Sequence, residues 1–226
     1  MPFSGLSERV AAIRETVGAA VKRGGHGQHV EIVAVTKTYG PEAVEAAWQA
    51  GLTTVGENRV QEALDKMAQV TVPVRWHLIG HLQRNKARHV ERFDLVHSVD
   101  SVRLAQAVDE VGERRARPVP VLIQVNTTGE ETKGGFSLTE LADQVSVLGA
   151  LGGLEVRGVM TMAPLGADEA MLRRAFRGAR EAREVLQRHG LDAPELSMGM
   201  SGDFEVAVEE GATMIRLGTI LFGARD

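Results

Sequence analysis

Apolar and polar positions follow two different rhythms along the chain. Short runs rich in β-branched residues, bounded by polar turns, predict strands. Longer stretches with apolar residues three and four positions apart predict helices. Eight runs have the strand pattern: 31–35, 53–56, 75–79, 95–99, 119–126, 155–161, 195–198 and 214–218. An amphipathic helical pattern at about residues 5–23 precedes the first of these runs.

The stretches between the strands carry signals for helix ends. One pattern begins with Pro41 and stops at Gly51, as expected because proline suits the first helical turn and glycine the residue after the last. Ser101 is placed to cap a second helix, and a third pattern ends at Gly190. Asp203 is a candidate cap for the helix after the seventh strand. This alternation of strands and helices is typical of a parallel sheet.

The number of strands indicates which α/β fold to expect. Eight strands, mostly followed by helices, are the count of a (β/α)8 TIM barrel. A doubly wound open sheet gives the same alternation, but no G-x-G-x-x-G fingerprint follows the first strand, which favours the barrel. No linker divides the chain, so we expect residues 1–226 to form a single barrel domain with an N-terminal helix.

Composition and charge narrow the classes of function. The chain has no cysteine, which excludes disulfides and thiolate chemistry and fits the cytoplasm. Its net charge of −4 gives no reason to expect nucleic acid. The N-terminus lacks the apolar core of a signal peptide, and no run reaches the roughly 20 apolar residues that a membrane helix needs. We therefore expect a cytoplasmic protein that binds neither nucleic acid nor membrane.

A lysine ends the first predicted strand. In a barrel and in an open sheet alike, ligands bind at the carboxyl ends of the strands. Lys37 stands at this end, in the sequence AVTKTYG. Burial lowers the pKa of an amine, and a neutral amine forms Schiff bases with carbonyl compounds. Lys37 is therefore either a nucleophile or a side chain that extends past the strand end into solvent.

The end of the seventh strand has the composition of an anion site. In LSMGMSGDF (196–204), small residues and the hydroxyl groups of Ser197 and Ser201 precede a predicted helix. Backbone N–H groups at the start of a helix attract anions, and small residues let an anion approach them. A plain strand-to-helix turn has the same pattern, so both readings stay open.

The last strand supplies a second candidate for the same site. In RLGTILFG (216–223), Gly218 and Thr219 stand after the eighth strand, a region where barrels often bind phosphate. Arg216 lies within the strand, where a guanidinium group needs a partner. That partner is either a ligand or a carboxylate on a neighbouring strand, such as Glu57.

The segment WHLIGHLQRNK (76–86) gathers polar side chains after the third strand. Its histidines have no carboxylate cluster and no H-E-x-x-H spacing beside them, so a metal site is not predicted. His77 alternates with apolar neighbours, and we expect it to be a hydrogen-bonded core residue.

A lysine amine, an anion cup and an arginine on one face suit a phosphorylated carbonyl compound. Pyridoxal 5′-phosphate (PLP) would use the amine for its aldehyde, the cup for its phosphate and the arginine for its ring nitrogen. A sugar phosphate bound as a Schiff base in an aldolase would use the first two groups equally well. The residues alone leave these two ligands open.

Several motifs together resemble the pyridoxal phosphate homeostasis protein family. The resemblance runs from about residue 5 to Arg225. The motifs that carry it are WHLIGHLQRNK (76–86), AVTK (34–37), GEN (56–58), GVMTM (158–162), SMGMSGD (197–203) and RLGTILFG (216–223). The resemblance implies a single-domain barrel of the alanine racemase N-terminal type.

The resemblance also implies roles for individual residues. By similarity, Lys37 forms a Schiff base with PLP. Ser201, Gly218 and Thr219 hold the phosphate, and Arg216 faces the pyridine nitrogen. Asn58 lies beside the ring.

The role implied by the resemblance is a monomeric carrier or regulator that releases PLP to apo-enzymes and is not itself an enzyme. Racemases of this type use a second base, a tyrosine from a further domain. Here Tyr39 is the single tyrosine, and the chain ends soon after the eighth strand. The alternatives are a weak PLP-dependent amino-acid racemase and a Schiff-base aldolase.

Two further basic regions are candidates for a functional role. Lys133, in the loop after the fifth strand, is either a lid or secondary amine or part of an ordinary solvated loop. Lys86 and Arg84 either guide an anionic cofactor or a partner, or form a solvated basic face.

Overall fold

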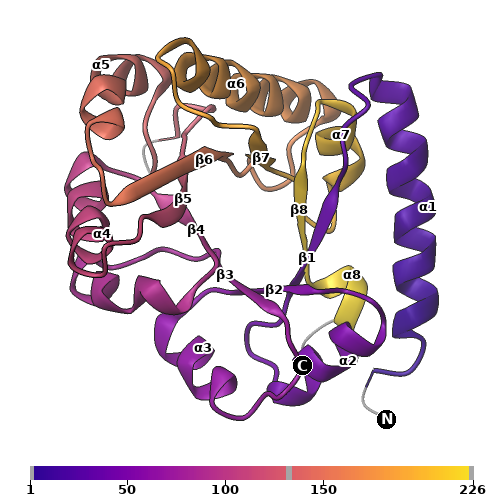
Figure 1. The fold of residues 1–226 in the computed structure, drawn as a ribbon. Coiled ribbons are helices and arrows are strands. Elements are labelled where there is room, and N and C mark those ends of the chain that lie inside the picture. The colour runs from indigo at the N-terminus through magenta and orange to yellow at the C-terminus, as the bar shows by residue number, and fades with distance from the viewer. Residues whose placement is uncertain (1–2, 131–133, 224–226) are drawn as a thin grey trace.

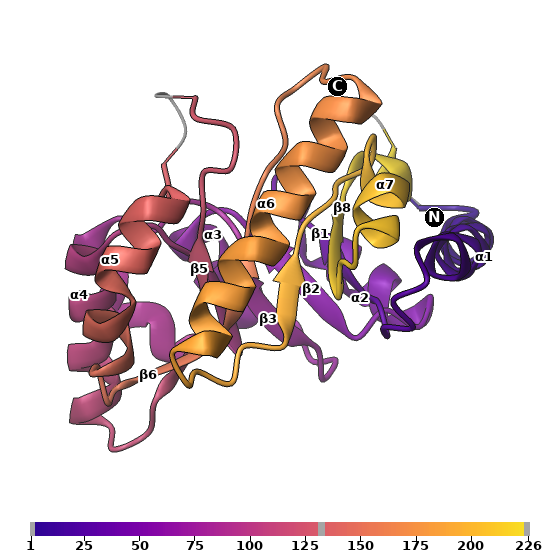
Figure 2. The same ribbon diagram turned by 90° about the horizontal axis from the view of Figure 1, so that it is seen from above.

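The computed structural model describes residues 3–130 and 134–223. Eight parallel strands close into a barrel in which each strand pairs with its neighbours in the sequence, and the first strand pairs with the last (Figure 1). The helices lie outside this ring, as both views show (Figures 1 and 2). The barrel is therefore confirmed over the open doubly wound sheet.

The predicted strands and helices are present with small shifts at their ends. The strands are β1 Glu31–Val35, β2 Thr54–Glu57, β3 Arg75–Leu78, β4 Leu95–Val99, β5 Val119–Gln124, β6 Leu154–Met160, β7 Glu195–Ser197 and β8 Met214–Leu217. The α-helices are α1 Leu6–Gly24, α2 Pro41–Gln49, α3 Val60–Met67, α4 Val102–Arg114, α5 Leu138–Gly149, α6 Glu169–Arg188, α7 Phe204–Glu209 and α8 Thr219–Phe222. A 3₁₀ segment, η1 Arg84–Arg92, follows β3 in place of an α-helix.

Helix ends follow the signals in the sequence. Pro41 begins α2, and the Ser101 hydroxyl accepts a hydrogen bond from Leu104 N at the start of α4. At α5, Ser137 and Glu140 form a capping box, which satisfies two backbone N–H groups at once. Among the helices of the described residues, none combines the length and the apolar composition needed to cross a bilayer.

The apolar core has two parts. The larger cluster joins the outer faces of the strands to the helices that cover them. A smaller cluster contains buried side chains from five strands: Val33, Leu95, Leu122, Met160 and Met214. Because these strands lie around the ring, this cluster fills part of the barrel interior. Buried polar side chains, among them His97 and Arg216, also occupy the interior.

Helix α4 packs directly on backbone at one point. A Cβ atom added at Gly112 would lie 2.0 Å from Gly153 O. We expect Gly112→Ala to push α4 away from the barrel and to lower the free energy of unfolding by about 1–3 kcal/mol. Urea denaturation measures this change.

The matched control is Gly18→Ala in α1, where an added Cβ meets no atom of the described residues outside its own helix turn within 4 Å. This change should raise the free energy of unfolding by roughly 0.5–1 kcal/mol, because alanine is the better helix former. Equal effects of the two substitutions would contradict the close approach at Gly112.

Candidate binding site

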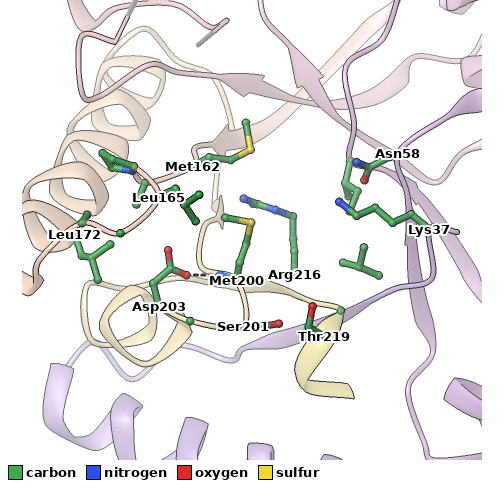
Figure 3. Close-up of a pocket in the computed structure, with 18 residues that line it drawn as sticks. Lys37, Asn58, Met162, Leu165, Leu172, Met200, Ser201, Asp203, Arg216 and Thr219 are labelled. Atoms are coloured by element: carbon green, nitrogen blue, oxygen red, sulfur yellow. Dashed lines mark hydrogen bonds between the residues drawn. The ribbon is translucent and has the colours of Figure 1, made fainter. Parts of the chain in front are cut away.

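A cavity of about 580 Å³ opens at the carboxyl ends of the strands. This volume lies within the range of pockets that bind small molecules. The six residues expected at the site all line it: Lys37, Asn58, Ser201, Arg216, Gly218 and Thr219. In Figure 3, Lys37 and Asn58 enter from one side, Ser201 and Thr219 form another edge, and Arg216 lies between them. Segments far apart in the sequence thus meet at one cavity.

Lys37 is presented by a tight turn that follows β1. The backbone N–H of Tyr39 donates to Thr36 O at 3.1 Å, so Lys37 and Thr38 are the two central residues of the turn. Thr38 has φ 68°, in the left-handed region. That region is usual at the third position of a type II turn, where glycine or asparagine is the ordinary choice.

Arg216 is buried, and backbone and hydroxyl oxygens hold its guanidinium group. It donates to Ser197 O at 2.8 Å, to Ser197 Oγ at 2.6 Å and to Thr161 O at 2.8 Å. Of the two partners considered for Arg216, a ligand or a carboxylate such as Glu57, the structure rules out Glu57. Glu57 instead pairs with Lys66, and its Oε1 accepts a hydrogen bond from Thr36.

The charge on Arg216 therefore has no ion-pair partner among the described residues. Burial lowers the pKa of Arg216 to about 10, against a weaker opposing effect of the Asp203 charge, so the group stays protonated at neutral pH. A buried cation whose hydrogen-bond partners are neutral oxygens favours an anionic or electron-rich ligand in the cavity beside it.

Behind Arg216, a chain of hydrogen bonds crosses the barrel interior. Ser197 Oγ lies 2.9 Å from His97 Nδ1, and His97 Nε2 lies 3.0 Å from His77 Nδ1. The chain is satisfied when the hydroxyl donates to His97 and each neutral ring carries its proton on Nε2. The prediction that His77 is a hydrogen-bonded core histidine is confirmed. Burial lowers the pKa of His77 to about 3 and that of His97 well below its usual value.

Two loops form the edge where a phosphate was expected. Ile220 N donates to Ser201 Oγ at 3.4 Å, which brings the segment after β7 against the Gly218–Thr219 turn after β8. Asp203 stands at the cap position of α7, but its carboxylate accepts a hydrogen bond from Met200 N and makes none to the helix. Asp203 therefore occupies the predicted cap position without the side-chain hydrogen bond of a cap, and it also lines the cavity. Burial raises the pKa of Asp203.

The apolar wall of the cavity was largely missed in the sequence. It is built by the connection 161–168 between β6 and α6, together with Leu172 and Met200. Leu165 is fully exposed at this wall. The connection is longer than most strand-to-helix loops, which was the available signal that it takes part in binding.

Other candidates lie away from the cavity. His81 is exposed and approaches Asp100 at 3.2 Å. Asn126, the last residue of the fifth predicted strand, donates to Glu130 O at 2.8 Å within its own loop. Lys86 lies on η1, outside the cavity lining, and Lys133 lies outside the described residues. Within the described residues, no group of His, Cys, Asp and Glu side chains is placed to hold a metal ion.

Comparisons with known proteins agree with this fold. The family model for the N-terminal domain of alanine racemase matches residues 9–226. A pyridoxal phosphate homeostasis protein of Aquifex aeolicus is 40% identical over 222 residues, covering 96% of this chain and 97% of that protein. One from Pseudomonas aeruginosa is 39% identical over 227 residues, covering 99% and 97%. The fold and site thus define a barrel of the alanine racemase N-terminal type, and the chain belongs to the pyridoxal phosphate homeostasis protein family.

Solved structures extend this agreement. PipY of Synechococcus elongatus with PLP bound has a TM-score of 0.86 and 38% identity, covering 96% of this chain and 100% of that chain. Alanine racemase from Corynebacterium glutamicum has a TM-score of 0.72 and 19% identity, covering 95% of this chain and 61% of that chain. At that identity the second likeness shows the fold alone.

The two buried histidines should make stability depend on pH. Below pH 6.5 the unfolded chain binds protons on these rings, whereas the folded chain holds them neutral, so stability falls as pH falls. Each histidine should remove about 2 kcal/mol from the free energy of unfolding between pH 7 and pH 5. Urea denaturation as a function of pH measures the slope.

In His77→Gln, the free energy of unfolding should fall by about 2 kcal/mol less than in wild type between pH 7 and pH 5. His29→Gln, which changes an exposed histidine, is the control and should leave the slope unchanged. Equal slopes in wild type and His77→Gln would show that His77 titrates alike in the folded and unfolded chains.

Proposed function

We propose that this chain is a PLP-binding protein of intracellular PLP homeostasis, which holds the cofactor as a Schiff base on Lys37 and releases it to apo-enzymes. The observation that carries the proposal is the meeting of Lys37, Arg216 and the Ser201–Thr219 edge in one cavity. PLP bound to a homologue of the same fold supports the choice of ligand.

The donor set fits the three functional groups of PLP. The Lys37 amine suits an aldehyde, and the Ser201 hydroxyl with the Gly218–Thr219 turn suits a phosphate. Arg216 brings a fixed positive charge to the cavity, which suits the ring nitrogen, and Asn58 lines the side from which Lys37 enters. When bound, PLP supplies an aldehyde carbon that combines reversibly with an amine and releases water.

Arg216 also supports a protein that binds PLP without catalysing reactions on it. A guanidinium group donates hydrogen bonds and accepts none, so it keeps a facing ring nitrogen unprotonated. A pyridine ring in that state is a weaker electron sink for carbanions. Arg216 therefore positions the ring and does little to promote reactions at it.

The cavity contains few groups able to move a proton. Among the described residues that line it, the titratable side chains are Lys37, Asp203 and Arg216. Tyr39 is not part of that lining. Its ring packs against Phe3 and Phe222, and its hydroxyl donates to Gly223 O at 3.3 Å. These placements support a carrier that does not use a tyrosine base.

Lys37→Ala should abolish the covalent link and leave weaker binding through the phosphate edge, because the amine is removed and the edge is not. The measurement is borohydride reduction of protein incubated with PLP, followed by mass mapping of the modified peptide. Wild type should carry the pyridoxyl group on the peptide that contains Lys37.

Lys86→Ala is the matched control, because Lys86 lies outside the cavity. It should be labelled at Lys37 as wild type is. Labelling of wild type mainly at Lys86 or Lys133 would refute the assignment of Lys37. Turnover of alanine that is lost in Lys37→Ala would refute the carrier role in favour of a racemase.

Arg216→Gln should weaken the affinity for PLP by roughly tenfold to a hundredfold, the scale of losing a hydrogen bond to a charged group. Equilibrium titration followed by absorbance measures the affinity. Arg88→Gln, which changes an exposed arginine of η1, is the control. An unchanged affinity in Arg216→Gln would show that Arg216 serves the barrel interior alone.

A further inference from the structure

Three side chains from β2 and α3 hold the turn that presents Lys37. Lys66 Nζ donates to Thr36 O at 2.7 Å, on one side of Lys37. On the other side, Thr38 N donates to Glu62 Oε1. The Thr36 hydroxyl donates to Glu57 Oε1 at 2.6 Å. Both residues that flank Lys37 are thus fixed from outside the turn.

The three side chains form one network. Lys66 Nζ lies 2.7 Å from Glu57 Oε1 and 3.0 Å from Glu62 Oε1. The side chains of Glu57 and Lys66 are 0% and 6% exposed. Burial raises the pKa of Glu57, against the opposing effect of the hydrogen bonds from Lys66 and Thr36. Glu57 Oε2 has no hydrogen-bond partner in the part of the chain that the structure describes.

Stability alone does not explain such a pair. A buried ion pair contributes little net stability compared with apolar side chains of the same volume, since both charges lose their hydration. One buried carboxylate oxygen here is also left unsatisfied, which adds to that loss. Three hydrogen bonds join the network to Thr36 and Thr38, the residues on either side of Lys37.

The turn needs such support. Thr38 is β-branched, and its φ of 68° lies in the left-handed region, which L-residues other than glycine and asparagine rarely adopt. The hydrogen bond from Thr38 N to Glu62 is available in this conformation and stabilises it. Without it, the backbone at Thr38 would favour a negative φ, which would change the path of the turn that carries Lys37.

We propose that Glu57, Glu62 and Lys66 are positioning residues, which hold the turn Thr36–Tyr39 so that Lys37 is directed into the cavity. What Lys37 binds there rests on the proposed function, whereas the fixing of the turn does not. The end of β2 then contributes to the site in two ways. Asn58, just past the strand, lines the cavity, and Glu57, its last residue, accepts a hydrogen bond from Thr36 in the turn.

The test is Glu62→Ala, with Asp65→Ala as its matched control. Asp65 is an exposed carboxylate on the same helix, and its side chain bonds to Gln61. In the protein without cofactor, amide hydrogen exchange at Thr38 should become about tenfold faster in Glu62→Ala and stay unchanged in Asp65→Ala. Unchanged exchange in Glu62→Ala would overturn the proposal.

A second readout uses the cofactor. The ratio of PLP bound covalently to PLP bound without the covalent link should fall in Glu62→Ala by roughly five- to thirtyfold. This is the factor expected when the cost of the left-handed conformation at Thr38 is no longer offset by the hydrogen bond to Glu62. Adding Thr38→Gly should restore most of the ratio, since glycine adopts positive φ without strain. A general structural defect from Glu62→Ala would not be restored by that change.

Glu57 and Lys66 are tested together by Glu57→Gln with Lys66→Met. This double variant removes both charges and leaves neither alone in the interior, so it should fold. It should lower the covalent ratio as Glu62→Ala does, and an unchanged ratio would remove these two residues from the proposal. If wild type forms no bond at Lys37, the proposed function fails, while amide exchange still decides whether the turn is held as described.

Discussion

The parallel pairing of β1 with β8 is the interaction on which the site depends. It sets Val33 beside Arg216 and Ala34 beside Leu217, which closes the ring between the first and last strands. Because all strands run the same way, their carboxyl ends meet at one face. Lys37 and Arg216 stand far apart in the sequence and line one cavity as a result.

A second constraint follows from the closed ring. The barrel interior has to accommodate a guanidinium charge, and it does so with neutral partners, Ser197 and Thr161, rather than with a carboxylate. The chain through His97 to His77 satisfies the polar groups behind it. The charge therefore acts toward the cavity that Arg216 and Lys37 both line. An arrangement of this kind suits retention of an anionic aldehyde and offers little for proton transfer at its carbon atoms.

Much of this was readable in the sequence because strands and their ends leave a periodic signal. The strand ends pointed to Lys37 and Arg216, since ligands bind at that face in any parallel α/β sheet. Side-chain partners were not readable, because they depend on register and on which face of a strand a residue occupies. Glu57 was therefore considered as a possible partner of Arg216, although it pairs with Lys66 of α3. The start of α7 at Asp203 was readable, whereas the bond from Met200 N to its carboxylate was not.

A crystal structure of the chain grown with PLP, without reduction, tests the account most directly. It should show density continuous from Lys37 Nζ to the cofactor, the ring nitrogen facing Arg216, and the phosphate at Ser201 and the Gly218–Thr219 turn. A cofactor lying in the cavity without a bond to Lys37, or one bound at the exposed arginines of η1, would contradict it.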